Sequence, residues 1–396
     1  TAKLEDKSNF NIYTLTGGIL TAIGVAFWIA VGVFDVSFGG KMEVPSIAIL
    51  PLDNKGNKSD EFYAFGISSD LISDISSSGL IRVAGLKDIE KLDYNNLSYD
   101  ELAKRLFVRY IGQGTIWRKD SIFQLSMELY DTKTDKVIGT KRWEEKWDDI
   151  SSITGILADN ILNLLKVSRK QDIPKVYSIN AEAYEYYVRA KYIYEKPGVI
   201  IENNDINVIK ELLYTAIKLD NQFFAAKILL GEVIRYETDL FYHRMGGEYD
   251  TTYTEGYKKA IDIFNEILSQ TKEIDDKYWL VRAIYNLGKV YDHNHQYSKA
   301  LDYFTRSFEY SKDIGDNNNM IESAHHLAEV YDMLDNYDKS FEYNELTYKL
   351  AMEIQDKENM AKSLNNIGYL YAKIGEYDKA MDYFKRSLKI EEERGE

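Results

Sequence analysis

The chain has 396 residues, which is long enough for two or three structural units. Its formal net charge is −15, and so acidic a surface repels phosphate backbones, which excludes general nucleic-acid binding. The chain contains no cysteine, which excludes disulfides, thiol catalysis and thiolate metal sites.

An apolar run lies close to the N-terminus. No charged residue occurs over residues 8–34. A helix over residues 12–34 would be about 34 Å long, which is enough to cross a hydrocarbon core of about 30 Å. We therefore expect a flank over residues 1–11, a single transmembrane helix over residues 12–35 and a linker over residues 36–44. A cleaved signal peptide is the alternative, but no small-x-small cleavage site follows the run.

Few charges flank this run. Lys3 and Lys7 precede it and Lys41 follows it, so the positive-inside rule places the N-terminus in the cytoplasm. The expectation is a single-pass protein of a bacterial inner membrane with its bulk in the periplasm.

Small side chains recur every four residues along the same run. A stripe of this kind allows two helix backbones to approach closely in lipid, which predicts a homodimer face, although Gly and Ala are also simply common in membrane helices. The stripe consists of Thr14, Gly18, Ala22, Ala26 and Ala30.

Residues 45–168 have the pattern of a compact α/β domain with the element order β-α-β-α-β-β-β-α. Ser98 followed by Glu101 is a capping box that starts the second helix. Gly112 and Gly114, which flank Gln113, could suggest a phosphate loop, but the lysine and the strand-to-helix context of such a loop are missing. We therefore expect a kink or bulge in a strand here. The expected strands cover residues 46–52, 80–83, 108–117, 122–130 and 136–146, and the expected helices cover residues 61–77, 99–106 and 148–167.

Four segments of this domain carry a family resemblance. They are SIAILPLDN at 46–54, EFYAFGI at 61–67, LIRVA at 80–84 and VRYIGQGT at 108–115. Together they resemble the TolB-like amino-terminal domain, which is related to the FlgO-like domain. The resemblance implies a domain placed between a membrane helix and helical repeats, downstream of class III adenylate cyclase domains, serine/threonine protein kinase domains or some membrane-bound transcriptional regulators.

A 40-residue period dominates the C-terminal half, after a linker over residues 169–180. The pairs Leu287-Gly288, Leu327-Ala328 and Ile367-Gly368 share one phase, and each is followed by a tyrosine three residues later. The pattern resembles the tetratricopeptide repeat and predicts an all-α superhelix of about five repeats over residues 181–396. We expect a loop-forming insertion in the second repeat near residues 240–254.

Solenoids of this kind present a concave groove that binds peptides or partner helices. In related repeats an Asn two residues before the glycine position hydrogen-bonds a bound peptide; Asn286 and Asn366 match this position, and His326 replaces it in the middle repeat. The alternative is that these positions are simply polar residues exposed to solvent and bind no peptide. The expected groove residues are Arg282, Tyr285, Asn286, Lys289, Asp292 and His293, then Glu322, His325, His326, Glu329 and Asp332, then Lys362, Asn365, Asn366, Tyr369 and Lys373.

No catalytic motif is visible in the chain, so we expect neither an enzyme active site nor a cofactor. The histidines and Asp292 could form a metal site, but we expect them instead to belong to a polar turn between helices and to the polar face of the groove. The sequence therefore predicts a membrane-anchored scaffold or sensor that binds a protein partner and takes part in signal transduction. The alternative is the regulatory C-terminal part of an adenylate cyclase or kinase whose catalytic domain lies upstream of residue 1.

Overall fold

The computed structural model describes residues 44–78, 81–167, 178–196, 201–244 and 251–394. The expected transmembrane helix over residues 12–35, its flanks and the small-residue stripe from Thr14 to Ala30 lie outside these ranges. Among the described residues, no helix combines the length and the apolar character needed to span a bilayer.

The first described domain is built on a mixed six-stranded sheet. Strand β1 (Ser46–Ile49) lies parallel to β3 (Arg82–Val83) and β4 (Tyr110–Lys119), and β2 (Asp53–Asn54) also pairs with β4. An antiparallel meander then continues from β4 through β5 (Ile122–Asp131) to β6 (Lys136–Lys146). The strand order is β3-β1-β4-β5-β6.

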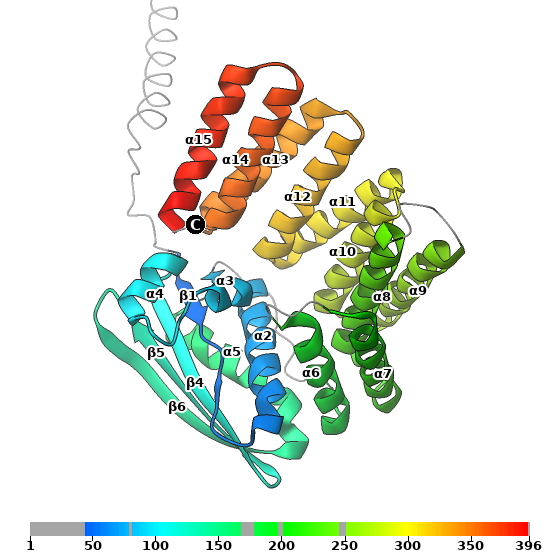
Figure 1. Cartoon of the computed structure of the whole chain (residues 1–396). Helices are drawn as coiled ribbons and strands as arrows, with labels where there is room; N and C mark the ends of the chain where they lie inside the picture. The colour runs from blue at the N-terminus through cyan, green and yellow to red at the C-terminus, as the bar shows by residue number, and fades with distance from the viewer. Residues whose placement is uncertain (1–43, 79–80, 168–177, 197–200, 245–250, 395–396) are drawn as a thin grey trace, which may run out of the picture. The chain divides into compact units, whose positions relative to one another are not determined.

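One face of this sheet is covered by helices. The side chains of Phe123, Leu125, Met127 and Leu129 alternate along β5 and are buried, as the period of two predicts. Helices α2 (Glu61–Ser77) and α5 (Ile153–Leu164) pack against each other and lie on the same side of the sheet (Figure 1). Helix α4 (Tyr99–Leu106) begins at the predicted capping box, in which the amide of Glu101 donates to Ser98 Oγ at 3.3 Å.

The structure adds elements that the sequence pattern did not reveal. These are β2, the short helix α3 (Leu86–Lys91) and the 3-10 turns η1 (Lys58–Asp60) and η2 (Trp147–Ser152), the last of which replaces the first turns of the expected final helix. Each has at most two buried residues, so no long hydrophobic pattern marks it.

The expected kink or bulge at Gly112 and Gly114 is wrong. Both residues pair in unbroken register with β5, and the irregularity lies instead between Leu129 and Tyr130 in the β5–β6 pair. A Cβ atom at Gly114 would lie 2.3 Å from the carbonyl oxygen of Ser126 and 2.6 Å from Leu52. Close approach of a neighbouring strand and side chain, rather than bending, therefore requires glycine at 114.

The C-terminal half consists of five stacked helical hairpins among the described residues (Figure 1). Residues 240–244 continue α8 and residues 251–254 begin α9, so these parts of the expected insertion are helical and not loop. The hairpins pair α6 (Ala181–Glu195) with α7 (Asn203–Leu219), α8 (Phe224–Arg244) with α9 (Thr251–Glu273), α10 (Lys277–His293) with α11 (Tyr297–Ile314), α12 (Asn317–Met333) with α13 (Tyr337–Glu353), and α14 (Lys357–Lys373) with α15 (Tyr377–Arg394).

The repeat motif is explained by packing inside each hairpin. A Cβ atom at Gly288 would lie 2.6 Å from the ring of Phe304, so the small residue is needed for α10 to approach α11. The tyrosine that follows stacks on a tyrosine of the second helix, as Tyr291 does on Tyr303 with ring centroids 5.2 Å apart. The turn aspartates, exemplified by Asp356 accepting from the amide of Asn359 at 3.1 Å, cap the first helices of the last three repeats, α10, α12 and α14.

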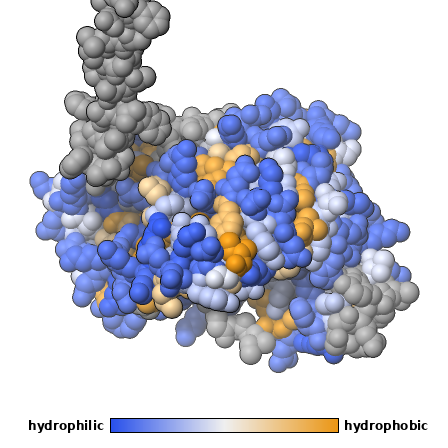
Figure 2. Space-filling view, turned by 90° about the horizontal axis from the view of Figure 1, so that it is seen from above, coloured by the Kyte–Doolittle hydropathy of each residue, from blue (hydrophilic) through white to orange (hydrophobic). Residues whose placement is uncertain are grey.

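The face of the molecule seen in Figure 2 is mostly hydrophilic, with small separate apolar areas. Exposed apolar side chains of the last two repeats include Met333, Ile374, Met381 and Leu388. Scattered exposed apolar residues of this kind are normal on a folded surface.

Candidate functional site

The first helices of neighbouring repeats bring many of the predicted groove residues together. The Tyr285 hydroxyl on α10 lies 3.1 Å from Nε2 of His326 on α12 and 3.5 Å from the carboxylate of Glu322. The His326 ring stacks on Phe304 with centroids 4.9 Å apart. These contacts join the first helices of the third and fourth repeats.

Glu329 is the ionic centre of this surface. Its carboxylate lies 3.3 Å from His325 Nε2 and 3.0 Å from His326 Nδ1. Burial opposes ionisation of Glu329, but the hydrogen bonds from the two histidines outweigh it and hold the pKa of Glu329 well below its usual range. Burial likewise opposes protonation of His325, but the bond to Glu329 raises the pKa of His325 above its ordinary value.

The fifth repeat continues the surface in a more open form. Lys373 on α14 donates to the Asp332 carboxylate on α12 at 2.7 Å, which joins the fourth and fifth repeats. Tyr369 is 53% exposed and Asn365 is also exposed, whereas Asn366 is half-buried. Lys362 pairs with Glu358 on its own helix.

The third repeat is more enclosed. Burial lowers the pKa of Lys289 and raises the pKa of Asp292. Asn286 is only 4% exposed, and its Nδ2 donates to the carbonyl of Arg282 one turn earlier at 3.0 Å. In this arrangement the amide of Asn286 is used within its own helix.

Several first helices of the repeats contact a helix of the α/β domain. Helix α2 of the α/β domain contacts α6 and α12. The Tyr278 hydroxyl on α10 donates to Asp74 Oδ1 at 2.8 Å, and the Asn318 side chain on α12 donates to the Ser76 carbonyl at 2.7 Å. The N-terminal halves of these first helices therefore contact α2.

The contact between α2 and α6 contains a buried ion pair. Asp70 is 1% exposed and pairs with Lys191, which is 6% exposed. Asp70 also accepts a hydrogen bond from the Tyr187 hydroxyl at 2.9 Å. Asp70 and Asp74 lie four residues apart on α2, and both are buried, so each requires a partner; the burial that makes this requirement is seen only in the structure.

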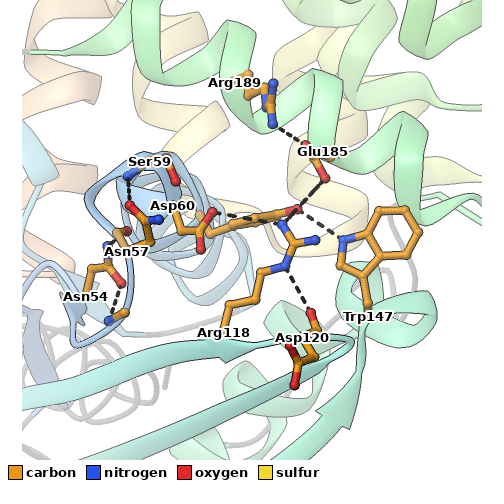
Figure 3. A network of polar contacts seen from close by, with 11 residues as sticks. Asn54, Asn57, Ser59, Asp60, Arg118, Asp120, Trp147, Glu185 and Arg189 are labelled. Carbon is orange, nitrogen blue, oxygen red and sulfur yellow. Dashed lines mark hydrogen bonds and ion pairs between the residues drawn. The ribbon is translucent and has the colours of Figure 1, made fainter.

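A second polar network lies nearer the N-terminus of α6 (Figure 3). The Tyr63 hydroxyl donates to Glu185 at 2.6 Å and accepts from Trp147 Nε1 at 3.2 Å. Arg118, at the end of β4, lies 3.9 Å from the Glu185 carboxylate. Burial and the bond to Glu185 raise the pKa of the Tyr63 hydroxyl, so this link is neutral on the tyrosine side at physiological pH.

We use the name open groove for the part of the predicted binding surface formed by His325, His326, Glu329, Asn365, Asn366, Tyr369 and Lys373. These side chains lie on the C-terminal halves of α12 and α14, beyond the positions that contact α2. Within the described residues, no group of three His, Asp or Glu side chains has the arrangement of a metal site.

Two family models match the repeats, and several known proteins are similar to parts of the chain. Residues 281–314 and residues 319–393 match two models of the tetratricopeptide repeat, so helices α10–α15 are tetratricopeptide repeats. A protein of Rhizobium meliloti (strain 1021) named "Putative adenylate cyclase 3" is 26% identical over 195 residues, which cover 46% of this chain and 31% of that protein. The chain thus spans about a third of the length of this curated relative.

Two solved structures are similar to parts of this chain. MamA is 19% identical and the match covers 50% of this chain and 99% of that one, with a TM-score of 0.33. TolB from Acinetobacter baumannii is 17% identical over 31% of this chain and 28% of that one, with a TM-score of 0.25. These TM-scores are too low to carry a functional argument.

Proposed function

We propose that this protein is an interaction scaffold whose open groove binds a polypeptide segment of a partner protein. The observation that carries the proposal is the continuous surface from His326 through Glu329 to Lys373, which offers hydrogen-bond donors and acceptors across adjacent repeats. Side-chain amides such as Asn365 can both donate to and accept from a peptide backbone of any sequence.

The contact with α2 supports the same reading. The Tyr278 and Asn318 side chains already bind helix α2 through a carboxylate and a backbone carbonyl. Recognition of a helix in a groove is a recurrent binding mode, and here it joins the α/β domain to the repeats. A partner in the open groove would therefore bind beside the α/β domain, which suits a module that senses or docks.

The groove is tested by a matched pair of double variants. Asn365→Ala with Tyr369→Ala should lower capture of the partner, identified by cross-linking in membranes, at least tenfold. Asn207→Ala with Tyr214→Ala, which removes an equally exposed tyrosine from helix α7, should leave capture unchanged. Equal capture by both variants would reject the open groove.

We further propose that residues 12–35 anchor the chain in a bacterial inner membrane, with the bulk in the periplasm and with pairing through the stripe of small residues. The support is the uncharged run in the sequence. Replacing Gly18 and Ala22 with Leu should abolish self-association in a membrane reporter assay, because the larger side chains separate the helix backbones. Unchanged association would remove the pairing.

A second candidate function rests on the Rhizobium relative. Because that protein is named as an adenylate cyclase, and because the TolB-like resemblance implies the same setting, this chain is a candidate for the regulatory part of a cyclase or kinase. Reading the residues encoded upstream of Thr1 separates the two. A cyclase or kinase domain there would favour the regulatory role, and its absence would leave the scaffold without an attached enzyme.

A further inference from the structure

A cavity of about 300 Å³ lies between helix α2 and the first helices of the repeats. None of the residues that define the open groove lines it, so the two sites can be tested separately. Its polar and aromatic walls come from α2, α6, α8, α10 and the start of α12, and include Ser73, Tyr187, Glu232, Tyr278, Trp279, Tyr285 and Asn319.

The lining of this cavity carries an excess of negative charge. Five carboxylates face two cations, Lys191 and Arg282. Lys191 pairs with Asp70 and also lies 4.0 Å from Glu195, and Arg282 lies 3.9 Å from Asp316. Glu232 and Glu322 also line the cavity, so the five carboxylates exceed the two cations by three negative charges when all are ionised.

The pKa shifts of groups that line the cavity agree with its excess of negative charge. Burial, followed by the negative charges of Glu322 and Glu232, raises the pKa of the Tyr285 hydroxyl well above its ordinary value. Burial also raises the pKa of Glu195; Lys191 and the hydrogen bond from Ser69 oppose the rise, and the charges of Asp70 and Glu232 add to it. A cation placed among these carboxylates would relieve the repulsion.

The aromatic walls indicate what kind of cation fits. Tyr187, Tyr278, Trp279 and Tyr285 line the cavity, and the guanidinium of Arg282 already lies 3.5 Å from the ring centroid of Tyr278. Aromatic faces attract alkylammonium and guanidinium groups, whereas a small metal ion prefers a compact shell of oxygen ligands. We propose that this cavity binds an alkylammonium group, contributed by a free diamine or by a lysine side chain of a bound peptide.

Occupancy of the cavity would couple the two domains. Asp70 and Ser73 come from the α/β domain, whereas Glu232 and Glu322 come from the repeats. A ligand that contacts both sets binds only while α2 is docked, so it stabilises the docked state by mass action. The cavity is thereby a site at which a small cation strengthens the contact between the α/β domain and the repeats.

The test uses the full chain and putrescine, with 1,4-butanediol as the neutral isostere and succinate as the dianion. Isothermal titration calorimetry should show saturable binding of putrescine but not of butanediol or succinate. The thermal unfolding temperature should likewise rise by several degrees with putrescine and not with the other two compounds. Glu232→Gln with Glu322→Gln should weaken binding at least tenfold. Glu309→Gln with Glu345→Gln, which neutralises two exposed carboxylates outside the cavity, should not change it.

Each outcome is decisive. No saturable binding of putrescine or of the capped tripeptide acetyl-Gly-Lys-Gly-amide, equal binding by the Glu232/Glu322 variant, or an equal shift with butanediol would overturn the assignment. Tighter binding of the tripeptide than of putrescine assigns the ammonium group to a peptide lysine, and the reverse order assigns it to a free amine. If the double variant unfolds, the single variant Glu232→Gln serves, with a weaker but still measurable loss of affinity.

Discussion

The buried pair of Asp70 and Lys191 gives the sharpest stability prediction. Lys191→Met keeps the length and apolar stem of the side chain but removes the ammonium, which leaves the Asp70 carboxylate 1% exposed without its counter-ion. Removing one partner of a buried ion pair costs about 3–5 kcal/mol. Because Asp70 retains the Tyr187 hydroxyl as a donor at 2.9 Å, we expect the lower end, about 3 kcal/mol.

The assay is urea unfolding of the full chain, followed by circular dichroism. Lys191→Met should lower the free energy of unfolding, whereas Lys312→Met, at an exposed position of α11, should change it by less than about 0.5 kcal/mol. Adding Asp70→Asn to Lys191→Met should recover most of the loss, because a neutral amide oxygen still accepts from the tyrosine. A loss below about 1 kcal/mol for Lys191→Met would refute the reasoning that this pair is buried and holds α2 on α6.

Two further predictions concern the repeats. Because the pKa of His325 is raised on folding, its contribution to stability is complete below about pH 6.5 and is lost as the pH rises through the folded pKa. Because the pKa of Glu329 is lowered, its contribution is present above about pH 4.3 and is lost on acidification. The pair should therefore stabilise the fold most between these two pH values. NMR titration of His325 should show its pKa falling in Glu329→Gln, and an unchanged value would contradict the pairing. Gly288→Ala should cost about 1–3 kcal/mol in thermal unfolding because its Cβ would meet Phe304 at 2.6 Å. Gly112→Ala should cost clearly less, because the nearest atom to its Cβ would be 3.7 Å away.

The repeats were predictable because their signals are local. The glycine at 288, the tyrosine at 291 and the cap aspartate at 276 each act within one hairpin, so the sequence period places α10 and α11 before any long-range contact is known. The long helix α2 also has the bounds that its hydrophobic spacing predicts. Short elements with few buried residues, such as β2 and α3, left no comparable signal.

The docking of α2 on the repeats could not be read from the sequence. The hydrogen bond between Tyr278 and Asp74 joins residues 204 positions apart, and that between Asn318 and Ser76 joins residues 242 positions apart. A polar residue on a helix face predicts a partner or solvent equally well, so Asp74 indicates a contact only once its burial is known. The burial of Asn286, which lines the cavity beside α2, likewise could not be predicted from the sequence.

The scaffold role is tested most directly by site-specific photo-cross-linking in living cells. A benzoylphenylalanine placed at Tyr369 in the open groove and, as the matched position, at Tyr214 on helix α7 samples two equally exposed sites. We predict a single discrete protein adduct from position 369 that is lost when Asn365 is replaced with Ala, and no adduct from position 214. Adducts of equal yield from both positions, or none from position 369, would contradict polypeptide binding in the groove.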